Sequence, residues 1–471
     1  MKNRTLIPAA LFLAVFCVGE FLQPYSLIRM ENRGLFLLTP DWLREVLSGS
    51  HPISEPLASL LVQFYDLPLA GALITAAIIT LTCLALSFGL KRTGVPLPRL
   101  IALAAVLGVW FFTAQLQSNL LPVMILLIAA AAALLSLVLK KKEEKPAPRW
   151  ELPAAIILTL CAAVLIGIHP RTVMQERLAK AQVNTRLHRW DKVLEAASPA
   201  HAAADPQLMP YAFLALGETG TLGDRLFQYP ISGPDDFGME GDNSPEACLF
   251  NSLLSECLHL PNEAIHQIFQ YSAHLPHGMS HLSLYQLIKY NIEKGDYTLA
   301  RKYAHILGRN PKDRRAARAI LKAYASTPDV ADTAGHSSAY ASVLTKDPVL
   351  NLALMEEEGL GTALSANRIL CYQLLYGNLE GFQRLMESAS WPGGRMPVHF
   401  QEALLIAGTD SSTPGIDNAT LRRFNTFSRA VLEKDKAAIQ KTADGTYWGY
   451  YLMIRERKPA DRDADAAFPG S

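Results

Sequence analysis

Five long apolar segments, separated by polar stretches, occupy the first third of the chain. They run over residues 6–22, 67–90, 100–114, 120–139 and 152–168. A helix that crosses the hydrocarbon core of a bilayer needs about 20 mostly apolar residues, because lipid offers no partner for bare backbone polar groups. The pattern therefore predicts a bundle of about five transmembrane helices within residues 1–170.

The pattern changes at about residue 171, where apolar positions begin to recur at helical spacing between polar ones. Proline and glycine residues fall between the predicted helices, and few stretches alternate as strands do. We therefore predict an all-α protein, with a soluble helical domain over residues 171–457. Residues 458–471 are rich in Asp, Ala, Arg and Pro and are expected to form a flexible tail.

One stretch of the soluble domain has the signature of a helical hairpin: Leu284, Leu287, Gly295, Tyr297 and Ala300. Large apolar residues on a first helix, a Gly-x-Tyr turn and a small residue on the second helix resemble a tetratricopeptide repeat. Weaker copies begin near residues 188 and 377. A stack of such hairpins is the expected architecture, because a single unit cannot bury its own apolar face. An irregular helical bundle is the alternative.

Residues 23–66 form a loop that is too long for a simple turn. It contains an amphipathic stretch at residues 39–47 with a helix start signal at Thr39. This stretch is expected to lie on the membrane surface as an interfacial helix. Packing of the loop against the soluble domain is an equally open interpretation.

The distribution of charge bears on partners and on orientation. With 44 Lys and Arg against 43 Asp and Glu, the chain lacks the focused basic surface that nucleic acids require. Alternate loops collect ten basic residues on one side of the predicted membrane and seven on the other. Because basic residues are retained in the cytoplasm, we expect a cytoplasmic N-terminus. We expect the first apolar segment to be an uncleaved signal anchor. The C-terminal domain would then be periplasmic, in a bacterial inner membrane.

Motifs that carry chemistry are not apparent. His274, His277 and His281 have nearly helical spacing, but Pro276 interrupts it and no further ligands complete a metal site. We find no phosphate-binding loop, nucleophile elbow, His-Glu-x-x-His helix or Cys-x-x-Cys pair. No catalytic, cofactor-binding or metal-binding residue is therefore assigned, and no cofactor is expected. The cysteines are expected to remain buried thiols.

Four polar side chains in or beside the apolar segments are candidate functional positions: Glu20, Gln63, Gln115 and Gln117. An ionisable group inside a membrane segment is a functional hypothesis by default. Glu20, however, lies near the outer end of its segment, where its carboxylate can reach the interface.

Three short segments resemble a family. They are Arg33-Gly34-Leu35-Phe36-Leu37-Leu38-Thr39, Leu60-Leu61-Val62-Gln63-Phe64-Tyr65 and Gly445-Thr446-Tyr447-Trp448-Gly449-Tyr450-Tyr451. Together they look like an uncharacterised family of bacterial multi-span membrane proteins of unknown function. The resemblance implies the membrane architecture and carries no activity over.

Two hypotheses for function follow. The first is a membrane-anchored interaction or scaffold protein of the cell envelope, whose helical hairpins bind a protein or peptide. The second is a membrane enzyme or transport component that acts on a lipid-linked or other envelope substrate. A shallow groove on the soluble domain would favour the first. A deep polar cavity lined by Glu20 and Gln63, or by Gln115 and Gln117, would favour the second.

Overall fold

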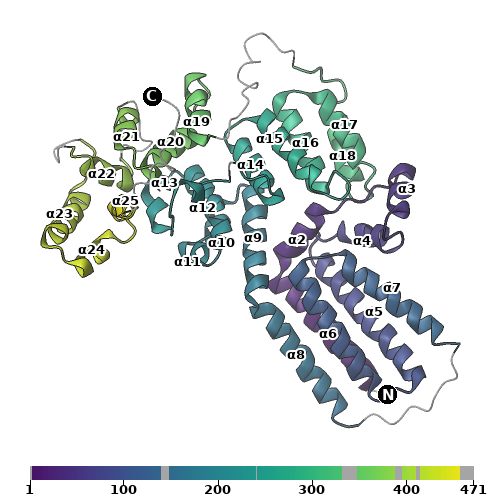
Figure 1. Cartoon of the computed structure of the whole chain (residues 1–471). Helices are drawn as coiled ribbons and strands as arrows, with labels where there is room; N and C mark the ends of the chain where they lie inside the picture. Colours follow the sequence, from purple (N-terminus) through teal and green to yellow (C-terminus); the bar gives the residue numbers. More distant parts are fainter. Residues whose placement is uncertain are drawn as a thin grey trace. The chain divides into compact units, whose positions relative to one another are not determined.

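The computed structural model describes residues 3–138, 148–239, 241–330, 347–387, 395–409 and 414–456. All regular elements in these ranges are helices, which confirms the all-α prediction for this part of the chain (Figure 1). The chain forms two compact units. The first unit contains Met1–Val183 and Tyr271–Val330, and the second contains Asn184–Gln270 and Ala331–Ser471. The predicted tail, residues 458–471, lies outside the described residues.

Apolar helices form one end of the first unit. They are α1 (Asn3–Cys17), which the π-helical turn η1 (Val18–Leu22) continues, α5 (Ala70–Thr93), α6 (Pro98–Leu116), α7 (Leu120–Leu135) and α8 (Glu151–Ile168). Among the residues that the structure describes, four stretches are long and apolar enough to cross a membrane: Thr5–Leu22, Ala70–Thr93, Pro98–Leu116 and Glu151–Ile168. The remaining predicted segment corresponds to α7, which is apolar but shorter, with 16 residues.

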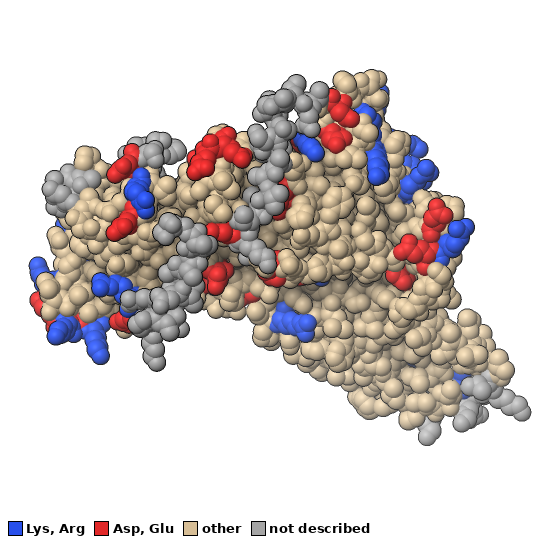
Figure 2. Space-filling model, turned by 45° about the horizontal axis from the view of Figure 1, so that its top comes forward, with Lys and Arg blue, Asp and Glu red and all other residues tan. Residues whose placement is uncertain are grey.

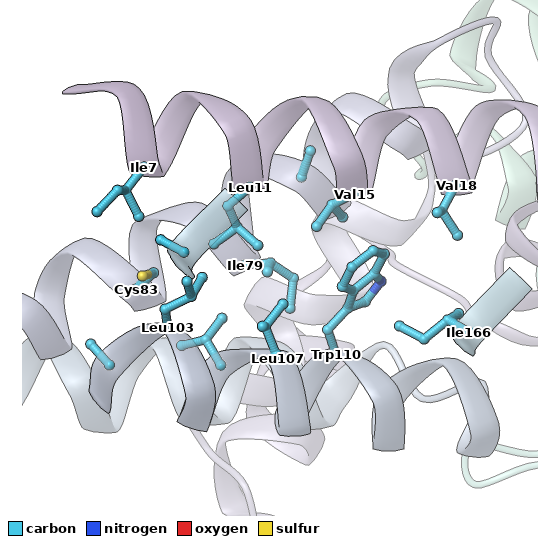
Figure 3. Packing of buried hydrophobic residues seen from close by; sticks show 14 of the residues in the cluster. Ile7, Leu11, Val15, Val18, Ile79, Cys83, Leu103, Leu107, Trp110 and Ile166 are labelled. Atoms are coloured by element: carbon cyan, nitrogen blue, oxygen red, sulfur yellow. The ribbon is translucent and has the colours of Figure 1, made fainter. Parts of the chain in front are cut away.

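These helices pack through one continuous apolar core (Figure 3). One face of α1 and η1 is buried against α5 and α8, in a cluster that also contains residues of α6. Its residues follow one another at helical spacing: Ile7, Leu11, Val15 and Val18. Trp110 of α6 fills the end of this core near Val18 and Ile166.

The outer surface of the bundle is apolar as well. Phe88 on α5 is 45% exposed and Leu160 on α8 is 57% exposed, and many other large apolar side chains of these helices point outward. Figure 2 shows a broad face over the bundle with few charged residues. A helix that is apolar on all sides is typical of a membrane span.

The long loop between α1 and α5 is helical. It contains α2 (Pro24–Arg33), α3 (Pro40–Ser48) and α4 (Ser54–Val62). Thr39 caps α3 as predicted, since its hydroxyl accepts a hydrogen bond from the Trp42 amide. The loop packs against later residues of the same unit: the amide of Leu38 donates to the carbonyl of Arg309, and that of His281 donates to the carbonyl of Gly34. The structure thus shows the second interpretation of this loop, in which the loop packs against residues of the predicted soluble domain.

The predicted hairpin is present in the first unit. It consists of α16 (His281–Lys294) and α17 (Tyr297–Leu307), and α18 (Arg314–Ala323) packs beside α17. Leu284, Leu287 and Ala300 are fully buried. Gly295 ends α16 with a φ of 84°, a conformation that favours glycine, and the ring of Tyr297 stacks on that of Tyr324.

The division into units differs from the predicted boundary at residue 170. Helices α16–α18 belong to the predicted soluble domain, yet they group with the apolar helices. The physical reason is that α16 packs on α2, and that residues 34 and 38 of the long loop form backbone hydrogen bonds with His281 and Arg309. Helix α9 (Pro170–Arg186) begins in the first unit and its last residues belong to the second.

The second unit is built from short helices. They are α10 (Trp190–Ala196), α11 (Pro199–Ala204), α12 (Met209–Glu218), α13 (Leu222–Arg225), α14 (Pro245–Cys257), most of α15 (Pro261–Ala273), α19 (Pro348–Glu357), α20 (Ala363–Leu375), α21 (Leu379–Met386), α22 (Val398–Ile406), α23 (Asn418–Glu433), α24 (Lys436–Ala443) and α25 (Tyr447–Glu456). Nearly every residue of α12 is buried. Near residue 377, α20 and α21 form a hairpin in which the Asn378 side chain caps α21 and Phe382 is fully buried.

Candidate functional sites

The structure brings two of the four predicted polar positions close to the same end of the bundle. The Gln115 amide donates to the Thr172 hydroxyl at 2.7 Å, and the Gln117 amide donates to the Ser26 hydroxyl at 3.1 Å. Gln63 is buried and donates to the Leu60 carbonyl, whereas Glu20 is half-buried in η1. Among the described hydrogen bonds, none joins Glu20 or Gln63 to the other two. Each of the three glutamine side chains therefore donates one hydrogen bond within the first unit.

A carboxylate that the sequence did not single out anchors the same region. Glu176 of α9 accepts hydrogen bonds from the backbone amides of Tyr25 and Ser26, at 2.9 and 2.8 Å. These amides lie at the start of α2, where helix N–H groups have no partner within the helix. Burial raises the pKa of Glu176 to about 7, although its hydrogen bonds and Lys180 lower it. Glu176 thus fixes α2 to the segment that follows the last apolar helix.

A larger group of charges, which we term the charge cluster, lies between the long loop and the hairpin region of the first unit. It contains Glu31, Asp66, His281, Lys312 and Asp313. Lys312, in the turn before α18, contacts the carboxylate of Glu31 and lies 2.6 Å from that of Asp66. The second oxygen of Glu31 accepts the backbone amide of Asp66 at 2.7 Å. One ammonium group therefore joins two acidic residues of the loop.

The other half of the charge cluster is a histidine–carboxylate pair. His281, at the start of α16, contacts Asp313 through Nε2 at 2.8 Å. The hydroxyl of Tyr285, one turn later on α16, donates to the other oxygen of Asp313 at 3.3 Å. Nδ1 of His281 lies 3.9 Å from Glu31, so the two halves adjoin. Asp313 and Glu31 are almost completely buried.

The burial of Glu31 governs the electrostatics of the charge cluster. Removal from water disfavours a carboxylate and raises the pKa of Glu31 to about 8, although Lys312 lowers it. Burial also lowers the pKa of Lys312, but its hydrogen bonds to Asp66 and Glu31 outweigh this and hold that pKa above its usual value. The cluster therefore binds protons tightly while it joins the loop to the turn before α18.

Two of the three histidines that the sequence suggested for a metal site, His277 and His281, contact carboxylates. His277 lies between the carboxylates of Glu45 and Glu55, at 3.2 and 2.9 Å, with its ring edge-on to Trp42. Within the residues that the structure describes, no three His, Cys, Asp or Glu side chains are grouped as metal ligands. His277 instead adds a second polar contact between the long loop and the segment before α16.

The second unit has a surface cleft with a volume of about 720 Å³. One wall is the segment from η3 (Leu226–Gln228) to Ile231, and the others are α24 and the start of α25. Phe227, Tyr229 and Tyr450 form an apolar floor and are almost completely buried. Lys441 and Asp444 are exposed at the edge. The cleft thus combines an aromatic floor with a charged rim.

Helix α25 owes its place in the cleft wall to a buried carboxylate. Glu402 of α22 is fully buried, and one of its oxygens accepts the Tyr447 backbone amide at 2.8 Å and contacts Nδ1 of His399 at 2.9 Å. The other oxygen accepts Arg423 at 3.1 Å. Three groups from three elements therefore converge on one side chain that defines where α25 begins.

The glycines of this wall allow close approach and a tight turn. A Cβ atom on Gly449 would lie 2.2 Å from the carbonyl oxygen of Ala443, so only glycine lets α25 pack on the end of α24. Gly445 has a φ of 65°, which glycine adopts without strain. The indole of Trp448 donates to the Thr442 carbonyl and is buried. Residues 445–451, the C-terminal one of the three segments that resemble the family, therefore form the structural basis of this side of the cleft.

In the part of the chain that the structure describes, all regular elements are helices, four stretches are suited to cross a membrane, and the second unit carries a surface cleft. The model of DUF6057, a family of unknown function, matches residues 2–174 and 171–454. The chain belongs to this family, which confirms the resemblance to an uncharacterised family. No curated protein and no solved structure matches the chain.

Proposed function

We propose that the protein is a membrane-anchored interaction protein, which binds a protein or peptide segment in the cleft of the second unit. The observation that carries this proposal is the cleft itself. Its volume of about 720 Å³ lies within the range of roughly 300–1,000 Å³ that is usual for ligand sites. Its aromatic floor suits an apolar side chain, and the exposed Lys441 and Asp444 suit a polar backbone or charged neighbour.

The cleft on the second unit is the feature that favours an interaction protein over the alternative. A membrane enzyme or transport component would use a polar cavity among the apolar helices. Gln63 and Gln115 are instead buried and hydrogen-bonded to their neighbours. In this proposal the hairpins α16–α17 and α20–α21 are tetratricopeptide-like units, and the charge cluster holds the first of them close to the anchor.

The proposal includes a location. Helices α1, α5, α6, α7 and α8 cross a bacterial inner membrane, with the N-terminus in the cytoplasm and the C-terminal part in the periplasm. The contrast in loop charge and the apolar outer surface of the bundle support this arrangement.

A pair of fusions tests the orientation. A reporter enzyme that is active only outside the cytoplasm should be active when fused after Pro170 and inactive when fused after Lys142. The reason is that α8, between these positions, carries the chain across the membrane. Activity is measured in whole cells, with fusion levels compared by immunoblot. The opposite result would place the C-terminal part in the cytoplasm.

Peptide binding tests the cleft. Peptides selected by display against the purified full chain should bind it in solution, as fluorescence polarisation measures. Ala437 is exposed and lines the cleft, so Ala437→Trp should fill the cleft without disturbing the core and weaken binding at least about tenfold.

The matched control is Lys436→Trp. Lys436 is exposed on the same helix and does not line the cleft, so this variant should bind the peptides as the wild type does. If both variants bind equally well, or no peptide is selected, the cleft is not the interaction site.

A further inference from the structure

An apolar groove lies between two of the membrane-suited helices, at the end of the bundle where α5 and α7 finish. It has a volume of about 520 Å³ and is lined almost entirely by apolar atoms. Small residues form its walls, among them Ala85 and Gly89 on α5 and Ala129 and Ala133 on α7. The groove does not belong to the cleft or to the charge cluster.

The groove lies beside a close contact between α5 and α7. A Cβ atom on Gly89 would meet its nearest neighbour, Cα of Ala133, at 3.7 Å, which is ordinary van der Waals distance. The two helices are therefore close at this point, and the small side chains of Gly89 and the alanines leave the groove open beside the contact. A water molecule occupies about 30 Å³ and needs polar partners, so water does not suit this apolar space.

A cation is fixed at the mouth of the groove. Arg92, on the last turn of α5, donates through Nε to the Ser136 carbonyl at 2.9 Å and through Nη2 to the Leu137 carbonyl. Its guanidinium lies over the ring of Phe88, 5.9 Å from the ring centroid. Ser136 itself lines the groove. These contacts hold a positive charge beside the end of the groove where Ser136 lies.

We propose that this groove binds one acyl chain of an anionic phospholipid, whose headgroup phosphate pairs with Arg92. Hydrocarbon chains surround a membrane helix at this depth, and an anionic headgroup complements a cation at the interface. The basic residue Lys91 adjoins Arg92 in the sequence and strengthens this preference. The proposal rests on the membrane insertion proposed above.

Native mass spectrometry of the full chain, extracted in mild detergent, tests the groove. Phosphatidylglycerol or phosphatidylcholine is added in equal amounts, and the lipids retained per chain are counted. The wild type should retain one phosphatidylglycerol and at least tenfold less phosphatidylcholine. Gly89→Leu fills the groove and should retain neither lipid at this level. Arg92→Gln should retain both lipids equally, because the groove remains while the positive charge of the guanidinium is lost.

Gly108→Leu is the matched control. Gly108 lies on α6, and a Cβ atom there would meet nothing within 4 Å, so the larger side chain fits without filling the groove. This variant should retain phosphatidylglycerol as the wild type does, and size-exclusion profiles should agree for all variants.

Three results would overturn the proposal. They are equal retention by Gly89→Leu and Gly108→Leu, equal retention of the two lipids by the wild type, or a dimer without lipid that Gly89→Leu dissociates. The last result would make the groove a docking site for a second copy. Failure of the membrane proposal is distinct: the chain would then leave the membrane fraction in an alkaline wash.

Discussion

Replacing Lys312 with methionine should lower the free energy of unfolding by about 3–5 kcal/mol at pH 9, the cost of breaking a buried ion pair. Methionine keeps much of the apolar stem, so the loss arises from the missing ammonium group. Glu31 is then a nearly fully buried carboxylate without a cation. Thermal unfolding of the full chain in detergent measures the effect.

The effect should depend on pH with a definite sign. Burial raises the pKa of Glu31 to about 8 in the folded chain, from 4.5. Stability from its bound proton is fully present below about pH 4.5 and is lost as the pH rises through about 8. Lys312 opposes that loss. At pH 6 Glu31 keeps its proton, so removal of Lys312 breaks only the half-exposed ion pair with Asp66 and should lower the free energy of unfolding by only about 1 kcal/mol.

Two variants complete this experiment. Lys322→Met removes an exposed lysine of α18 and should change the unfolding free energy by no more than about 0.5 kcal/mol. The double variant Lys312→Met with Glu31→Gln should recover much of the loss at pH 9, because no buried charge remains. A Lys312→Met protein that melts like Lys322→Met at pH 9 would show that the charge cluster does not hold the loop.

Glu402→Ala should destabilise the second unit by about 3–5 kcal/mol. The substitution leaves the buried Tyr447 amide and His399 without their shared acceptor, and each buried polar group without a partner costs about 1–3 kcal/mol. The half-exposed Arg423 loses the same acceptor but can bind water instead. Because Glu402 defines the start of α25, peptide binding in the cleft should be lost as well. Thermal unfolding and fluorescence polarisation measure the two effects.

Conservative and surface variants separate these causes. Glu402→Gln keeps one oxygen acceptor and should lie between the wild type and Glu402→Ala in both measurements. Glu433→Ala removes an exposed carboxylate of α23 and should change neither. A Glu402→Ala protein that melts normally would contradict the role assigned to this side chain.

Local signals in the sequence predicted local structure well. The Thr39 cap, the turn at Gly295 and the buried Ala300 depend on residues within a few positions, and the structure contains each of them. The apolar segments were predicted equally well, because a helix that crosses a bilayer needs a long, uninterrupted run of apolar residues. The exception is α7, which has only 16 residues although its apolar segment is longer.

The two candidate sites could not be predicted in this way. Lys312 and Glu31 are 281 positions apart, and no local pattern marks either as a partner of the other. The cleft likewise joins the segment near Phe227 to α24 and α25, about 200 residues later. Two of the three segments that resemble the family lie at these sites. Gly34 and Leu38 contact the hairpin region, and residues 445–451 line or support the cleft.

The separation of Lys312 from Glu31 also sets an order of events during biosynthesis. At roughly 5–20 residues per second, the ribosome adds the intervening 281 residues in roughly 15–60 s. During this interval the loop has left the ribosome before Lys312, in the turn before α18, has been made. The apolar cluster of Phe36 and Trp42 is built from loop residues alone and can form at once, whereas Glu31 gains its lysine partner only after translation has passed this turn.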